Sequence, residues 1–145
     1  MTRPEIAIAC VAPLTERLDQ DALKTTLQAV LSDQSAGGLV TLILTDDTTL
    51  RRLNRDFRGI DAPTDVISFD LKDPVHPAGR EIGEIYISLD RARVQARGAH
   101  RPLQEEITHL AVHGVLHLLG YTHNTHAAYA SMQRQEVRYL ARVNR

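Results

Sequence analysis

The stretch from Ile107 to Gly120, ITHLAVHGVLHLLG, constrains the fold more than any other part of this sequence. Its apolar residues fall on nearly all sides of a helix, and a helix of that kind is buried rather than laid on a surface. Pro102 is a favoured first position for it, and Glu105 and Glu106 suit the positive end of its dipole. We therefore expect this helix in the core, with any chemistry that it carries in a shielded place.

Four other segments show the alternation or the β-branched runs typical of strands, and four more show apolar residues at helical spacing. The strands are predicted at Ile6–Ala12, Leu39–Leu44, Asp65–Leu71 and Glu84–Ser88. The further helices are predicted at Leu18–Ser32, at Asp47–Phe57 with Leu50, Leu53 and Phe57 in the core, from a cap at Ser88 or Asp90 to Gly98, and at Ala127–Val143 with Tyr129, Met132, Val137 and Leu140 in the core. The order β-α-β-α-β-β-α-α-α predicts one α+β domain, residues 1–145, with about four strands in a mixed sheet and about five helices.

Composition is ordinary for a globular protein, at 43% apolar and 24% charged residues, and 145 residues can bury a real core. The sequence has no run of 18 apolar residues and no secretory leader pattern, so neither membrane insertion nor secretion is supported. Cys10, the single cysteine, falls in an apolar run and is predicted to be a small core residue of a protein from a reducing compartment. We expect a cytoplasmic protein.

Three histidines on and after the buried helix predict a metal site. His113 and His117 stand four residues apart, on one helical face, and Gly120 lets the chain turn so that His123 can reach the same ion. Three neutral imidazoles leave a tetrahedral metal with one open position, as in catalytic sites, and zinc, one ion per chain, is the expected metal. His109 lies four residues before His113 and is either a fourth ligand or a partner that orients a ligand.

Arginines recur at helical spacing in three places, and such stripes suit a phosphate backbone, although each is also typical of a solvated helix face. The sets are Arg51, Arg55 and Arg58; Arg93, Arg97 and Arg101; and Arg134, Arg138 and Arg142. The formal net charge of −1 argues against indiscriminate binding of nucleic acid through overall charge. A polyanionic substrate is plausible on these grounds but is not established by them.

The histidine spacing matches the metal framework of metzincin proteases, but those enzymes need Glu directly after the first histidine as general base. Here that position is Gly114. A peptidase mechanism would lack its proton acceptor, so the metal must serve another chemistry.

Two blocks of this chain resemble the YbeY family of bacterial endoribonucleases. Residues 113–123, HGVLHLLGYTH, are similar to the family signature HGxLHLxGYDH, and residues 53–69, LNRDFRGIDAPTDVISF, to its LNxxYRxxDxPTDVLSF. Residues 82–88, IGEIYIS, resemble its LGDIxIS strand. The similarity runs from about Leu39 to Met132, most of the chain.

The resemblance implies a zinc-dependent ribonuclease that acts on single-stranded ribosomal RNA, including the 3′ end of the small-subunit RNA, with a role in ribosome quality control. The implied partners are ribosomal RNA and the small ribosomal subunit, with no membrane and no DNA. It also implies that Arg58 lies in the cleft near the metal, where a guanidinium can grip a phosphate. The alternative for Arg58 is an ion pair with Asp61 or Asp65. Arg55, in the same stripe, is a second candidate for substrate binding, and Asp65 either shapes the loop that aims Arg58 or acts as a base.

One departure from the family pattern matters. The family usually has Asp before the third histidine and acidic residues after it, where this chain has Thr122 and then Asn124, Thr125 and His126. If that Asp supports a ligand, its replacement weakens metal binding or activity by about ten- to a hundredfold. An alternative function is therefore a ribosome-assembly factor that binds RNA or protein, holds a metal and hydrolyses little.

Overall fold

The computed structural model describes residues 3–73, 75 and 80–143, and within these ranges it contains the predicted order of elements. They are β1 (Pro4–Cys10), α1 (Gln20–Asp33), β2 (Gly38–Thr45), α2 (Asp47–Arg58), β3 (Val66–Asp70), β4 (Glu81–Ser88), α3 (Leu89–Gly98), α4 (Leu103–Leu118) and α5 (His126–Val143). The α+β class, the four-stranded mixed sheet and the five helices are confirmed. Ser88 caps α3, since its Oγ accepts a hydrogen bond from Arg91 N at 3.2 Å.

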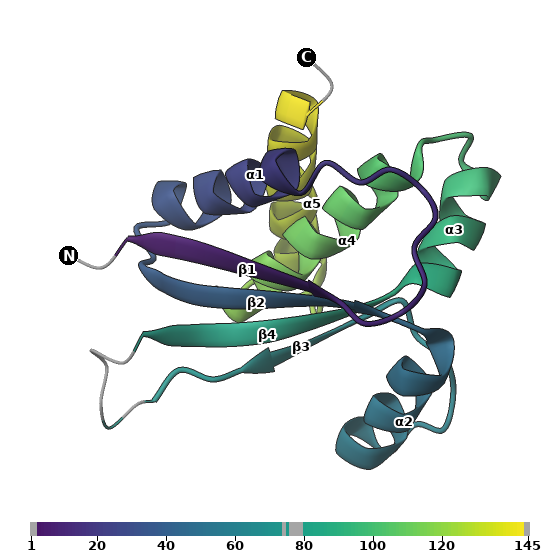
Figure 1. Cartoon of the computed structure of the whole chain (residues 1–145). Helices are drawn as coiled ribbons and strands as arrows, with labels where there is room; N and C mark the ends of the chain where they lie inside the picture. The colour runs from purple at the N-terminus through teal and green to yellow at the C-terminus, as the bar shows by residue number, and fades with distance from the viewer. Residues whose placement is uncertain (1–2, 74, 76–79, 144–145) are drawn as a thin grey trace.

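The sheet has the order β1-β2-β4-β3. β1, β2 and β4 run parallel, whereas β3 pairs antiparallel with β4 and forms an edge of the sheet. In Figure 1, α1, α3, α4 and α5 gather on one side of the sheet, and α2 stands apart from them, near β3 and β4. The edge strand β3 therefore has α2 and α4 as its helical neighbours.

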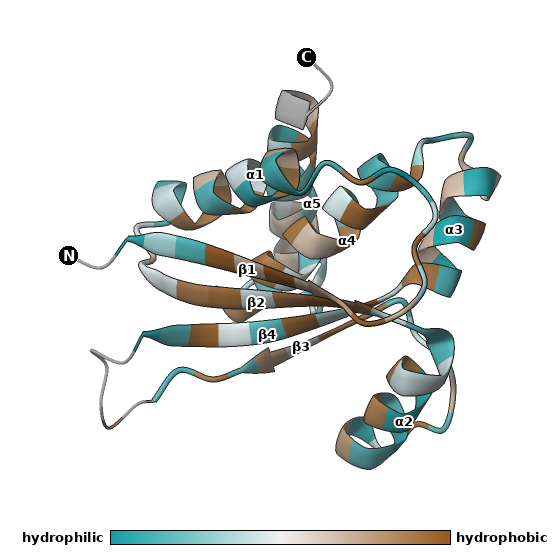
Figure 2. Ribbon diagram, in the orientation of Figure 1, coloured by the Kyte–Doolittle hydropathy of each residue, from teal (hydrophilic) through white to brown (hydrophobic). Residues whose placement is uncertain are grey.

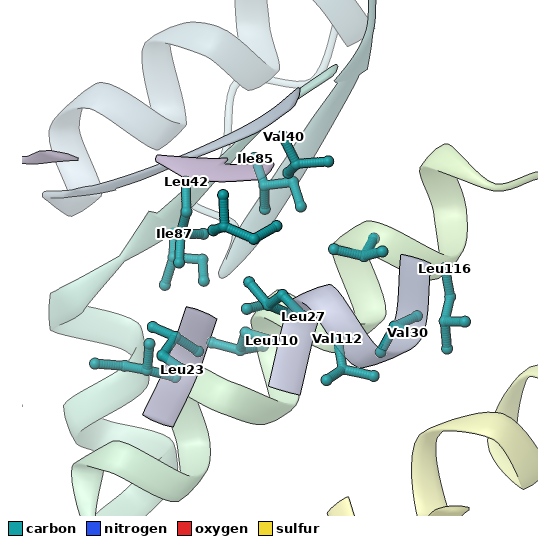
Figure 3. Packing of buried hydrophobic residues seen from close by; sticks show 14 of the residues in the cluster. Leu23, Leu27, Val30, Val40, Leu42, Ile85, Ile87, Leu110, Val112 and Leu116 are labelled. Carbon is teal, nitrogen blue, oxygen red and sulfur yellow. The ribbon is translucent and has the colours of Figure 1, made fainter. Parts of the chain in front are cut away.

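The hydrophobic core lies between the sheet and the helices α1 and α4. Figure 3 shows Leu23, Leu27 and Val30 of α1 meeting Leu110, Val112 and Leu116 of α4 beneath Val40, Leu42, Ile85 and Ile87 of the sheet. Figure 2 shows apolar residues concentrated along the strands, with hydrophilic residues prominent on α1 and α2. The prediction that the apolar helix is buried is confirmed, because ten of the sixteen residues of α4 are buried.

Two glycines let α4 approach the sheet closely. A Cβ atom on Gly114 would lie 2.7 Å from Ile85 Cγ2, and one on Gly83 would lie 2.6 Å from Leu118 Cδ2. Real Cβ atoms do not come so close, so a side chain at either position would push the helix and the sheet apart. The Oγ of Ser68 in β3 also donates to the carbonyl oxygen of Gly114 at 3.1 Å. These contacts fix the distance of α4 from the sheet and its rotation about its own axis, and so they determine the direction in which its histidines point.

Some side chains predicted to lie in the core do not lie there. Cys10 is exposed, because β1 is the other edge strand and buries only Ile6. Phe57, Tyr129 and Val137 are also exposed, which corrects the predicted core faces of α2 and α5. The predicted core residues Leu50 of α2 and Met132 of α5 are buried, together with Asn54 and Tyr139, which were not predicted. The buried face of each helix is therefore narrower than its apolar pattern indicates. Helix α4 begins at Leu103, one residue later than predicted, and Pro102 is its N-cap.

Candidate metal centre

The three histidines of the predicted metal site converge. His113 and His117 lie one turn apart near the end of α4, and their Nε2 atoms are 3.1 Å apart. One ring nitrogen from each of these residues and one from His123 lie within 4.8 Å of one another. Among the His, Cys, Asp and Glu residues that the structure describes, these three histidines are the group whose ligand atoms lie close enough to hold one metal ion.

The turn after α4 brings His123 back to the helix. Gly120 has φ 96°, in the left-handed region that favours glycine, and its N–H donates to His117 O at 3.1 Å. The next N–H, that of Tyr121, donates to Leu116 O at 3.0 Å. Together these bonds form a Schellman motif, which closes the helix and reverses the chain. The role predicted for Gly120 is confirmed.

The donor set fits a divalent metal such as zinc. Two nitrogen ligands of a tetrahedral zinc ion are roughly 3.3 Å apart, close to the spacing of the His113 and His117 nitrogens. Burial lowers the pKa of His117, and the neighbouring His113 and His123 lower it further. A neutral imidazole is the form that binds a metal, so the site favours the ligand state of His117.

A carboxylate from α5 orients the first histidine. Glu136 Oε1 lies 2.5 Å from His113 Nδ1, and the Glu136 side chain is only 13% exposed. A proton on Nδ1 shared with this carboxylate leaves Nε2 with its lone pair toward the other two histidines. Glu136 was not predicted from the sequence, since an acidic residue in an amphipathic helix is typical of a solvated face.

Glu136 also contacts His109, which lies outside the three-histidine group. His109 Nε2 is 3.6 Å from Glu136 Oε2, and the nearby Glu136 carboxylate raises the pKa of His109. Burial raises the pKa of Glu136, but the contacts with His109 and His113 outweigh it and hold this pKa at about 2. His109 therefore contacts the carboxylate that lies against His113, and it is not part of the three-histidine group.

An open cleft of about 620 Å³ lies over the histidines, between α2, β3 and α4. Its lining consists of Phe57, Arg58, Thr64, Asp65, Val66, Ile67, Ser68, Phe69, His113, His117 and His123. A second cavity, of about 310 Å³, shares His113 and His123 with it and extends toward α3 and α5. The two histidines thus stand between a cleft that contains Arg58 and a cavity that contains Glu136.

Arg58 reaches the cleft without a carboxylate partner in the described part of the chain. Asp61, one of its expected partners, instead pairs with Arg51 at 2.8 Å. Asp65, the other, accepts a hydrogen bond from Gln95 Nε2 at 3.1 Å. Arg55 does not line the cleft; it is exposed and pairs with Asp56 at 3.1 Å.

The remaining positions of the predicted site are also clear. Thr122 is exposed and precedes His123. Its side chain makes no hydrogen bond among the described residues. Gly114 faces Ile85 and Ser68, so the position where metzincins carry their Glu points into the sheet. Within the ranges that the structure describes, no helix combines the length and the apolarity needed to cross a membrane.

Comparison with known proteins matches the chain to one family. The family model described as "Endoribonuclease YbeY" matches residues 11–144. Proteins of that name from Desulfitobacterium hafniense and Moorella thermoacetica are 40% and 42% identical to this chain; each match covers 90% of the chain, and 85% and 90% of the relative. The solution structure of TM1509 from Thermotoga maritima is 26% identical, has a TM-score of 0.63, and the match covers 94% of this chain and 88% of that one.

Proposed function

Because the chain belongs to the endoribonuclease YbeY family, we propose that it is a metal-dependent hydrolase that cleaves phosphodiester bonds in RNA. One observation carries this proposal: three imidazoles suited to a metal line the same open cleft as Arg58, which has no carboxylate partner among the described residues. A metal beside a phosphate-binding arginine is a recurrent arrangement in phosphoryl transfer. The whole described chain forms the single catalytic domain.

We assign the metal to His113, His117 and His123, with zinc, one ion per chain, as the native metal. When bound, such an ion supplies Lewis acidity, which polarises a phosphoryl oxygen and makes water more acidic. Glu136 holds His113 in the tautomer that binds metal, and His109 holds Glu136 from the other side. Burial of the α4 helix keeps both ligands rigid beneath the cleft.

Arg58 is the proposed catalytic residue of the protein itself. Its guanidinium binds the phosphate and offsets the charge that develops as the phosphodiester bond breaks. Arg55 contributes at longer range to the attraction of the RNA strand, because it is exposed one turn earlier on α2. Asp65 shapes the loop before β3: its carbonyl oxygen accepts from Ser88 N at 2.9 Å and its carboxylate from Gln95.

The proposed substrate is single-stranded ribosomal RNA, including the 3′ end of the small-subunit RNA, in maturation and in ribosome quality control. The small ribosomal subunit is the proposed partner and the cytoplasm the proposed location. Family membership supports these assignments. DNA and membranes are not among the proposed partners.

The second candidate is an assembly factor that binds RNA or protein, holds a metal and hydrolyses little. Thr122 favours it, since the family pattern has an acidic residue at this place. Glu136 favours the hydrolase, because it brings a partly buried carboxylate to the ligand set from α5. A metallopeptidase is disfavoured by the lack of space for an acidic side chain at Gly114.

A test uses purified protein of defined metal content on single-stranded RNA and on casein. His117→Ala should lose both metal and RNA cleavage, whereas His126→Ala should keep both, because His126 is an exposed residue outside the three-histidine group. Metal binding without RNA cleavage in the unaltered protein would favour the assembly factor. Cleavage of casein would favour the peptidase, and equal metal content in both variants would refute the ligand assignment.

A further inference from the structure

We propose that Phe57 is a platform on which an unpaired base of the RNA stacks while the neighbouring phosphate lies at Arg58. The proposal rests on the proposed function and specifies how the same cleft selects its substrate. Phe57 is 67% exposed, although it lies at a helical position in register with the apolar Leu50 and Leu53. The ring lines the cleft beside Arg58.

The Phe57 ring is held in place from one side by other rings. Phe69 of β3 meets it edge to face, with centroids 5.1 Å apart and planes at 72°. Tyr86 of β4 meets Phe69 in the same way at 5.7 Å. This geometry is the favoured one for aromatic pairs, and it fixes Phe57 while much of its surface stays open to solvent. A ring that is fixed in advance loses little freedom when a base stacks on it.

The surroundings of Phe57 suit a nucleic acid. The same helix carries four exposed arginines: Arg51, Arg52, Arg55 and Arg58. Exposed aromatic rings next to basic side chains are the combination that binds single-stranded nucleic acid, because every base has a face that can stack. In a duplex, each base is covered by its neighbours, so stacking on Phe57 requires an unpaired nucleotide.

The second cavity is a poorer place for the base that follows the phosphate. Asp65 lines both cavities, but only the second one also contains the carboxylates of Glu106 and Glu136, which repel the phosphates that flank any base. The second cavity does contain an aromatic residue, Tyr129, whose side chain is 50% exposed. Tyr129 therefore serves as a matched control: an exposed ring on the other side of His113 and His123.

The experiment measures RNA binding without cleavage. The full chain is treated with a chelator and titrated with a short single-stranded oligoribonucleotide that contains 2-aminopurine, whose fluorescence is quenched by stacking. Phe57→Ala should bind roughly 5- to 150-fold more weakly than the unaltered protein and lose the quenching. Phe57→Tyr should keep both, and Tyr129→Ala should match the unaltered protein. Thermal unfolding should be nearly the same for all of these proteins, because both rings are exposed.

Three results would overturn the proposal. The first is equal binding and quenching in Phe57→Ala and the unaltered protein, and the second is a loss in Tyr129→Ala alone, which would place the base in the second cavity. The third is an equal loss by Phe57→Ala for a duplex of the same length, since a duplex offers no free base face. Binding that depends on Phe57 in a protein that does not cleave RNA when loaded with metal would keep this inference and refute the proposed hydrolase.

Discussion

Replacing Glu136 by Gln should weaken metal binding while leaving the fold intact. The carboxylate lies 2.5 Å from His113 Nδ1 and is 13% exposed, so water screens the contact little. Glutamine keeps the shape and one hydrogen-bond acceptor but removes the negative charge. The His113 ring then becomes a less basic ligand, and its orientation is held less firmly.

The magnitude follows from the contact itself. A hydrogen bond between a buried charged group and its partner contributes about 1.5–3 kcal/mol, and outer partners of metal ligands typically change metal affinity by about ten- to a hundredfold. Glu136→Gln loses only the charge, so we expect about tenfold weaker binding. Glu136→Ala loses the acceptor as well and releases His109, so we expect a loss of up to about a hundredfold.

The assay is a competition titration of zinc against a chelating dye, with thermal unfolding of the metal-free proteins measured in parallel. Glu81→Gln is the control, because Glu81 is an exposed carboxylate at the start of β4 and outside both cavities. It should bind zinc as tightly as the unaltered protein does.

Unchanged zinc affinity in both Glu136 variants would refute the role of this carboxylate, because His113 would then be oriented without it. A loss of affinity that only accompanies a large drop in the thermal stability of the metal-free protein would also refute it. In that case Glu136 would stabilise the packing of α5 on α4 rather than the ligand.

Four further predictions follow from single contacts. Arg58→Ala should reduce cleavage of RNA far more than metal content or thermal stability; a loss of activity only in proportion to lost stability would show a structural role instead. Thr122→Asp should tighten metal binding or raise cleavage, because a carboxylate beside His123 can make a ligand more basic, and two unchanged values would show that threonine is neutral here. Gly114→Ala should lower the free energy of unfolding in urea by about 1–3 kcal/mol, since its Cβ would meet Ile85 at 2.7 Å, whereas Gly98→Ala, with open space around it, should be neutral or slightly stabilising. The hydrogen bond from Arg93 holds the pKa of Glu16 at about 2, below its ordinary 4.5. This pair therefore stabilises the fold above pH 4.5, by about 1 kcal/mol at this partly exposed site, and the stabilisation fades as the pH falls toward 2. In urea unfolding, Arg93→Gln should lose more stability at pH 7 than at pH 2.5, and equal losses would contradict the assignment.

Local patterns were enough to predict most of the fold. The strand and helix order followed from hydrophobic periodicity, which depends on neighbours within a few residues. The histidine cluster followed in the same way, because the helix spacing of His113 and His117 and the glycine turn before His123 are short-range features. The family resemblance, built on the same residues, was confirmed by the comparisons.

Apart from the first residue of α4, the errors and omissions concern contacts between elements that lie apart in the chain. Amphipathic spacing does not tell how much of an apolar helix face a neighbouring element covers, so Phe57, Tyr129 and Val137 were predicted to be buried although no other element covers them well. Similarly, the spacing of the charged residues could not predict that Asp61 pairs with Arg51 rather than with Arg58, which lines the cleft.

The sequence by itself therefore determined the elements, the buried α4 helix and the three converging imidazoles, because helix geometry and the turn at Gly120 act over a few residues. Only the tertiary structure decided that Glu136 contacts His113, that Arg58 lies in the cleft without a carboxylate partner among the described residues, and that the Phe57 ring stays exposed. Glu136 reaches His113 because α5 packs along α4, and Phe57 meets Phe69 because α2 ends beside the edge strand β3. Such pairings depend on the angles at which whole elements pack, and those angles are set by close contacts such as that of Gly114 with Ile85.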